Sequence, residues 1–310
     1  RGQDSHILNS EDEKETVSSV LGEFWNYCKF FIPAAWLGFV YTLLDRWMLQ
    51  HWSGSSEQAY YAVALNFSVV ALLATSSILR IFWKEIAEAK YQNDTERIKR
   101  YYLKVSRGLY FVGALVAGAL LPWAGEIITL LLGDAYNDGT LTLMVMLLYP
   151  VHQSMGQIGS TLLFATEQNR IQVIISLVFM VISMVVAYIM LAPNDMVIPG
   201  FGLGSRGLAI KMVVLQLIQV NAIAWFIARI HGWKFEWTYQ LVGLGGALLA
   251  GWVAQLLVGV LISSNVIVLM ICSTVLYLLM MGALVYAMPL LVGLDRNEIN
   301  DYISKIINLD

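Results

Sequence analysis

Eight stretches of this sequence are long and apolar enough to cross a lipid bilayer as helices, and this pattern constrains the fold most. A hydrocarbon core ~30 Å thick needs ~20 mostly apolar helical residues. The stretches do not alternate in polarity as barrel strands do. We therefore predict an all-α fold, a polytopic membrane helical bundle of about eight transmembrane helices. The stretches are Trp25–Leu49, Tyr60–Phe82, Gly108–Leu132, Leu141–Ala165, Ile171–Leu191, Gly207–Ile230, Leu241–Ser263 and Val266–Leu291.

The composition supports this prediction. Hydrophobic residues make up 58% of the 310 residues and charged residues only 13%, whereas soluble domains carry about 25% charged residues. The net charge is −3, so no basic excess indicates a nucleic-acid partner.

Lysine and arginine gather on one side of the predicted membrane. The connection after the second stretch holds Lys84, Lys90, Arg97, Lys99, Arg100, Lys104 and Arg107. We expect this connection, from Lys84 to Arg107, to be a charged helical extension along the membrane surface. The positive-inside rule makes this side cytoplasmic. An even number of helices then places both termini in the cytoplasm.

Motifs of soluble enzymes and metal sites are missing or misplaced. The two cysteines, Cys28 and Cys272, lie far apart in apolar stretches, and the four histidines have no metal-ligand spacing. Gly202–Gly207 fits the dinucleotide-binding pattern but follows no strand and opens a membrane helix. We therefore predict no catalytic group, no metal site and no cofactor.

Charged residues inside membrane helices are costly and usually functional. Asp45 and Arg46 lie toward the outer end of the first stretch, and helical spacing puts Gly38, Tyr41 and Asp45 on one face. One interpretation is a polar face lining a cavity, with Arg46 available to a phosphate or an acidic sugar. The other is an Asp45–Arg46 pair at the headgroups. The sequence leaves both open.

Two further cations lie within the predicted spans. Arg80 is near the inner end of the second stretch, where it contacts substrate or simply extends its side chain to the interface. Lys211 lies one turn inside the sixth stretch, and Gln216 and Gln219 fall within a ~140° arc of it. These three polar groups favour a cavity, although glutamines also hydrogen-bond neighbouring helices.

The fourth stretch carries a line of small and polar residues. Tyr149, Gln153, Gly156 and Ser160 follow one another at helical spacing, with His152 beside them. They could line a cavity or allow close helix packing. His152 is interpreted as structural rather than as a proton relay.

The pattern divides the chain into four parts. Residues 1–24 form a polar cytoplasmic segment, 25–230 a six-helix transporter lobe, 231–293 two additional apolar helices, and 294–310 a cytoplasmic amphipathic tail with Ile299, Ile303 and Ile306 on one face. The two apolar helices hold Gly243, Gly246 and Gly251, which would let them pack closely on a neighbour.

Several segments together resemble the polysaccharide flippases of O-antigen and capsule type within the multidrug/oligosaccharidyl-lipid/polysaccharide exporter superfamily. The resemblance covers nearly the whole chain and rests on the order and spacing of short motifs. These are Phe30–Leu49 with its Asp45-Arg46 end, Gln58–Ala64, the charged segment Phe82–Arg107, Leu130–Tyr136, Phe164–Arg170 and Gly204–Ala209. The glycine usual before the second helix and the proline usual before the charged segment are both replaced.

The resemblance implies that the chain corresponds to helices 7–14 of a two-lobed flippase whose first lobe is missing. It implies export of an undecaprenyl-pyrophosphate-linked oligosaccharide across the bacterial inner membrane by alternating access, driven by a proton or sodium gradient. Membrane lipids and the missing N-terminal lobe are the other implied partners. Cavity candidates are Arg46, Arg80, Lys211, Asp45, Gln153, Gln216 and Gln219, whose cations would attract the pyrophosphate.

Three alternatives remain from the sequence. The chain could be a multidrug antiporter or a peptidoglycan-precursor flippase of the same superfamily. It could also be a membrane-embedded polysaccharide polymerase or glycosyltransferase, although the external loops are short for one. A non-catalytic scaffold would need fewer charges inside its helices.

Overall fold

The computed structural model describes residues 10–29, 31–261, 265–298, 300–301 and 304. Within this part every regular element is a helix and no strand occurs, so the predicted all-α fold is confirmed. The elements are α1 (Ser10–Cys28), α2 (Phe31–Tyr91), α3 (Thr95–Leu120), η1 (Leu121–Trp123), α4 (Ala124–Leu132), η2 (Asp134–Gly139), α5 (Thr140–Met146), α6 (Tyr149–Ala165), α7 (Asn169–Leu191), α8 (Gly204–Ile230), α9 (Thr238–Leu261), α10 (Val266–Ala287) and η3 (Pro289–Val292).

Five helical segments of the described part are long and apolar enough to span a membrane, and the chain is a multi-pass membrane protein. The first is continuous from α3 to α4, and the others are α7, α8, α9 and α10. The count of eight spans stays a prediction.

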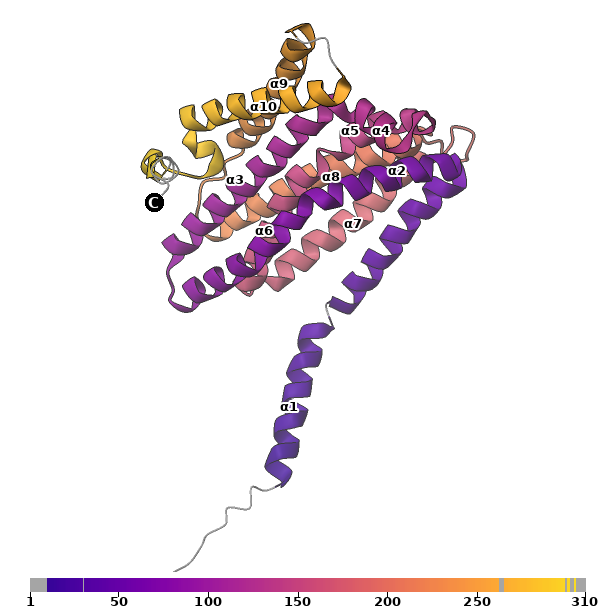
Figure 1. The fold of residues 1–310 in the computed structure, drawn as a ribbon. Helices are drawn as coiled ribbons and strands as arrows, with labels where there is room; N and C mark the ends of the chain where they lie inside the picture. The colour runs from indigo at the N-terminus through magenta and orange to yellow at the C-terminus, as the bar shows by residue number, and fades with distance from the viewer. Residues whose placement is uncertain (1–9, 30, 262–264, 299, 302–303, 305–310) are drawn as a thin grey trace, which may run out of the picture.

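Helix α2 is a hairpin made of two long helical limbs (Figure 1). At Gly54 the backbone takes φ 86° and ψ −179°, a conformation that a side chain would strongly disfavour. The two limbs contain the second predicted span and most of the first. The predicted span Trp25–Leu49 nevertheless crosses the junction between α1 and α2, because α2 starts just before Pro33, which cannot donate a backbone hydrogen bond inside a helix. Helix α1 projects away from the bundle.

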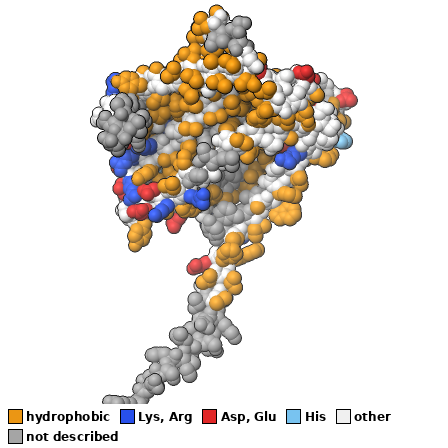
Figure 2. All heavy atoms as spheres, viewed as in Figure 1, with side chains coloured by type: hydrophobic (Ala, Val, Ile, Leu, Met, Phe, Trp, Pro, Cys, Tyr) orange, Lys and Arg blue, Asp and Glu red, His pale blue; other side chains and the backbone are white. Residues whose placement is uncertain are grey.

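The charged segment is the end of α2 and the start of α3, joined by a tight turn. Asn93 adopts φ 56°, and the Asp94 side chain caps α3 by accepting from the backbone N–H of Arg97 at 2.9 Å. The Arg97 guanidinium returns to Glu85 on α2 at 2.8 Å, and its hydrogen bond lowers the pKa of that carboxyl. Lysines and arginines are concentrated at this end of the bundle (Figure 2).

A proline divides the fourth predicted span, Leu141–Ala165, into α5 and α6. Pro150 has no N–H, so the carbonyl of Met146 one turn earlier lacks its helical partner. The buried Ser68 hydroxyl of α2 donates to this carbonyl at 2.7 Å. The interruption therefore joins α2 to the next helices rather than leaving an unpaired group in lipid.

Helices α9 and α10 lie against α3 (Figure 1). Pro122 leaves the Gly118 carbonyl of α3 without a helical partner. Gly251 of α9 packs directly on it, since a Cβ added there would lie 2.0 Å from that oxygen. The Gln255 side chain of α9 donates to the Pro122 carbonyl at 3.1 Å, and the Tyr277 hydroxyl of α10 donates to the Leu115 carbonyl at 2.9 Å.

After α10 the chain returns to α3. Glu298 binds Lys104 at 2.7 Å and accepts from the backbone N–H of Asp295 at 3.0 Å. The Lys104 ammonium and this N–H lower the pKa of the Glu298 carboxyl. The amphipathic face predicted for the tail, Ile299, Ile303 and Ile306, lies outside the described residues, as do residues 1–9 of the predicted polar segment.

Candidate functional site

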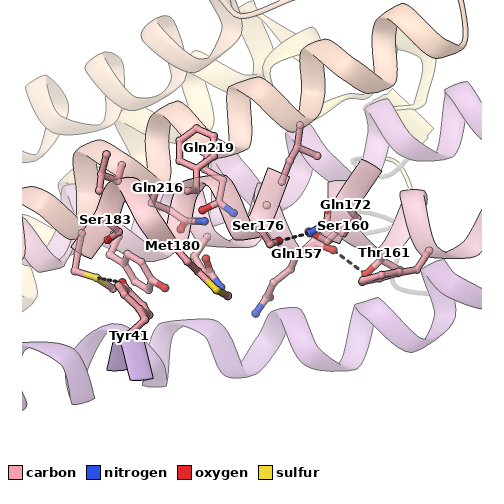
Figure 3. Close-up of a pocket in the computed structure, with 18 of the residues that line it drawn as sticks. Tyr41, Gln157, Ser160, Thr161, Gln172, Ser176, Met180, Ser183, Gln216 and Gln219 are labelled. Carbon is pink, nitrogen blue, oxygen red and sulfur yellow. Dashed lines mark hydrogen bonds between the residues drawn. The ribbon is translucent and has the colours of Figure 1, made fainter. Parts of the chain in front are cut away.

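A cavity of about 460 Å³ opens between α2, α6, α7 and α8 (Figure 3), and we call it the polar cavity. Eleven of its nineteen lining side chains carry an amide or a hydroxyl group, and none of the nineteen is charged. The eleven are Tyr41, Tyr149, Gln153, Gln157, Ser160, Thr161, Gln172, Ser176, Ser183, Gln216 and Gln219.

Helix α6 supplies both a polar face and a packing face. Tyr149, Gln153 and Ser160 follow one another at helical spacing and line the cavity. Gly156 and Gly159 bring α6 against α8, because a Cβ on either would lie 2.7 Å from a Val220 or Ile223 methyl group. Both uses weighed for this line of residues therefore occur in the same helix.

Two buried amide oxygens show that the wall has unused hydrogen-bonding capacity. The Oε1 atoms of Gln157 and Gln172 are buried and have no hydrogen-bond partner. The Gln172 amide donates instead to Ser176 at 3.2 Å. A buried acceptor without a partner costs about 1–3 kcal/mol, so a bound group that donates to these oxygens would recover that energy.

A buried ion pair borders the polar cavity. The Lys211 ammonium of α8 lies 2.5 Å from Asp45 Oδ2 of α2, and the two side chains are 0% and 7% exposed. The Tyr41 ring lies 4.6 Å from the same ammonium and also lines the cavity. Asp45 Oδ1 is buried without a partner.

The start of α8 is fixed in a way that places Lys211. The Glu57 carboxylate of α2 accepts from the backbone N–H of Ser205 at 2.7 Å, where it also faces the positive end of the helix dipole. The Ser205 hydroxyl shares a 2.8 Å hydrogen bond with Thr142 of α5. Because Lys211 follows less than two turns later, its ammonium meets Asp45 on the facing limb of α2.

The predicted site residues fall into three groups. Gln153, Gln216 and Gln219 line the polar cavity. Asp45 and Lys211 form the adjoining pair, whereas the side chains of Arg46 and Arg80 are exposed and do not line the cavity. In the structure the carboxylate of Asp45 therefore pairs with a lysine 166 residues away rather than with Arg46.

Helix α7 contributes three polar lining residues that the sequence analysis missed. Gln172, Ser176 and Ser183 lie on one face of an otherwise apolar helix. Their spacing of four and then seven residues is the signal that could have identified them.

His152 lies away from the polar cavity. It is buried against the Tyr110 ring, with centroids 5.8 Å apart, and lines a separate, mostly apolar groove of about 670 Å³ between α8 and α9. Its Nδ1 atom has no hydrogen-bond partner. The polar cavity and this apolar groove share no lining residue.

Comparison with protein-family models and with curated proteins found no match. Among solved structures, the chain is similar to the lipid II flippase MurJ in an inward closed conformation, with a TM-score of 0.64 and 12% sequence identity. The similarity covers 85% of this chain and 55% of that chain, so this chain spans about half of the flippase's length. At this identity the likeness shows the fold: this chain is an all-helical bundle like that of a flippase.

Proposed function

We propose that this chain is part of a flippase that moves a lipid-linked saccharide precursor across a bacterial inner membrane by alternating access. The observation that carries the proposal is the uncharged wall of amides and hydroxyls around the polar cavity. Sugar hydroxyls both donate and accept hydrogen bonds, and amide and hydroxyl side chains can likewise accept from them and donate to them. The fold likeness to a lipid II flippase supports the same conclusion.

Two saccharide carriers are candidates. The likeness to the structure of a lipid II flippase favours a peptidoglycan precursor, and we place it first. The sequence resemblance favours an undecaprenyl-pyrophosphate-linked oligosaccharide of O-antigen or capsule type, and we place it second. A drug antiporter is less well supported, because the cavity wall has no carboxylate and the neighbouring Asp45 is neutralised by Lys211.

We assign different roles to the three groups of site residues. Gln153, Gln216 and Gln219 bind the saccharide. The Asp45–Lys211 pair joins α2 to α8, and a proton or sodium ion arriving at Asp45 would weaken the pair and let the helices shift. This makes Asp45 the proposed coupling residue. Arg46 and Arg80, being exposed, would meet the pyrophosphate only outside the cavity wall.

The proposal requires a partner lobe and an orientation. The resemblance implies a preceding lobe of about six helices, against which this one would rock. The Lys and Arg pattern implies that both termini of residues 1–310 are cytoplasmic, and the family resemblance implies the bacterial inner membrane.

A deletion strain tests the function. The full-length gene is deleted, and surface polysaccharide and accumulated peptidoglycan precursor are both measured. Rescue is compared for wild type, for the double variant Gln153→Leu/Gln219→Leu, and for Gln50→Leu, an exposed glutamine of the same bundle. We expect the double variant alone to fail while reaching wild-type levels in the membrane.

The readout that changes identifies the carrier. Accumulated peptidoglycan precursor supports the first candidate, and loss of surface polysaccharide supports the second. Normal levels of both in the deletion strain would contradict the proposed function, and full rescue by the double variant would contradict the cavity assignment.

A further inference from the structure

A second cavity, of about 310 Å³, lies where α3 meets the connection between α8 and α9. It is separate from the polar cavity and shares no lining residue with it. We call it the basic cavity. Its lining consists of Lys99, Tyr102, Leu103, Ser106, Arg107, Met155, Ala224, Ala228, Gly232, Trp233, Lys234, Phe235, Glu236 and Tyr239.

The charges around the basic cavity are not balanced. Three cations line it, Lys99, Arg107 and Lys234, against the single carboxylate of Glu236. Arg107 is paired with Glu236. No ion pair joins Lys99 or Lys234 to another described residue, so two positive charges face the cavity uncompensated.

Arg107 is held in place from three directions. Besides its pair with Glu236, its Nη1 donates to the Leu290 carbonyl at 3.2 Å, and its guanidinium lies 5.2 Å from the centre of the Tyr239 ring. Its Nε–H is buried and has no partner. The neighbouring Ser106 hydroxyl is also buried, 2% exposed, and lies beside the Tyr239 hydroxyl. The cavity therefore presents an unused guanidinium donor together with its positive charge, which suits a phosphate group.

The lining also indicates a membrane ligand rather than a soluble one. Phe235 lines both the basic cavity and the apolar groove between α8 and α9. That groove continues along the bundle past Trp237, Leu241 and Leu248. An amphiphile could therefore place its phosphate among the cations and its chain along the groove. Aromatic residues such as Trp233 and Trp237 are typical of the membrane–water interface.

We propose that the basic cavity binds the phosphate headgroup of an anionic membrane phospholipid, with one acyl chain in the apolar groove. This site lies at the end of the bundle that the sequence predicts to be cytoplasmic, where anionic lipids attract Lys and Arg. The proposal does not depend on the transport substrate, because it concerns a bound membrane lipid and is tested by measuring phospholipid binding.

The test uses the purified full-length protein in detergent and measures bound lipid by native mass spectrometry. Phosphatidylglycerol and phosphatidylcholine are offered at equal concentrations. We expect several-fold preferential retention of phosphatidylglycerol. We expect the double variant Lys99→Gln/Lys234→Gln to lower that retention on the order of tenfold, and the double variant Lys99→Arg/Lys234→Arg to preserve it.

The matched control is Lys84→Gln/Lys90→Gln, which removes two exposed lysines of the same end that do not line the cavity. An equal loss in this control would show a general surface effect and overturn the proposal. Equal retention of the two lipids by wild type would also overturn it. Thermal stabilisation by inorganic pyrophosphate alone, matching that by phosphatidylglycerol, would indicate a soluble anion and overturn the lipid assignment.

Discussion

The bundle of α2 to α8 and the pair α9 and α10 differ in how many polar groups they bury and in how those groups are satisfied. The bundle of α2 to α8 encloses an uncharged polar cavity and a buried ion pair. Helices α9 and α10 attach to α3 mainly through glycine contacts and hydrogen bonds to backbone carbonyls. Their buried polar side chains Gln240 and Ser273 bind Asn221 and Trp123 and do not line the polar cavity. Both regions contact a carbonyl that a proline leaves without its helical partner: Ser68 donates to the carbonyl one turn before Pro150, and Gly251 packs on the carbonyl one turn before Pro122.

The difference teaches that buried polar side chains in this protein are concentrated where helices surround the polar cavity. In the bundle, the Asp45–Lys211 pair joins the side chains of two helices beside the cavity, and breaking it leaves a buried charge unsatisfied. Close backbone contact holds α9 and α10 against α3, so added side-chain volume should lower stability more than the loss of a polar group. The predictions below test this contrast.

The largest effect is expected from Lys211→Met. It leaves the Asp45 carboxylate buried without its cation, and breaking a buried pair costs about 3–5 kcal/mol. Thermal unfolding in detergent should show the loss. The exposed neighbour variant Arg46→Ala should change stability little. The double variant Asp45→Asn/Lys211→Met should recover much of the loss, and failure to recover any would argue against the ion pair as the cause.

The second effect concerns Gly251→Ala in α9. The added methyl group would overlap the Gly118 carbonyl, and overpacking of this kind costs about 1–3 kcal/mol. The control is Gly259→Ala, where no atom lies within 4 Å of the added Cβ and helix propensity improves by ~1 kcal/mol. Thermal unfolding should move in opposite directions for the two variants. Equal shifts would mean that α9 does not pack on α3 in this way.

The third effect is on ligand binding rather than on stability. Gln153→Leu or Gln219→Leu removes hydrogen bonds worth about 0.5–1.5 kcal/mol each, so binding of the saccharide carrier should weaken by roughly two- to tenfold. The matched variant is Gln255→Leu in α9, which breaks a contact to Pro122 outside the cavity. It should lower stability without changing affinity. An equal loss of carrier affinity in the cavity variants and in Gln255→Leu would contradict the different roles assigned to the polar cavity and to α9.

The smallest effect is a pH dependence at the end of the chain. The Lys104 contact lowers the pKa of Glu298, so the contact stabilises the folded state above the ordinary carboxyl pKa. This contribution is lost as the pH falls through the lowered value. Since both side chains are partly exposed, the contribution should stay below about 1 kcal/mol. Hydrogen-exchange protection of residues 294–298, measured relative to the intrinsic exchange rate at each pH, should fall in acid, and Glu298→Gln should remove this loss of protection.

The sequence predicted the membrane bundle because span length follows from bilayer thickness alone. It also selected Gln153, Gln216 and Gln219, since polar side chains on an apolar helix stand out. It did not pair Asp45 with Lys211, because the two are 166 residues apart and only the packing of α2 on α8 joins them. The basic cavity was equally out of reach, because Lys99 is on α3 and Lys234 lies in the distant connection between α8 and α9.

The one-residue turn at Gly54 has a mechanical consequence. Because a single residue connects the two limbs of α2, the end of one limb next to Gly54 cannot move without moving the other limb. The first limb holds Asp45 and the second holds Glu57 and Ser68, which bind α8 and the α5–α6 junction. A displacement of α8 would thus be transmitted through the α2 hairpin to the α5–α6 junction.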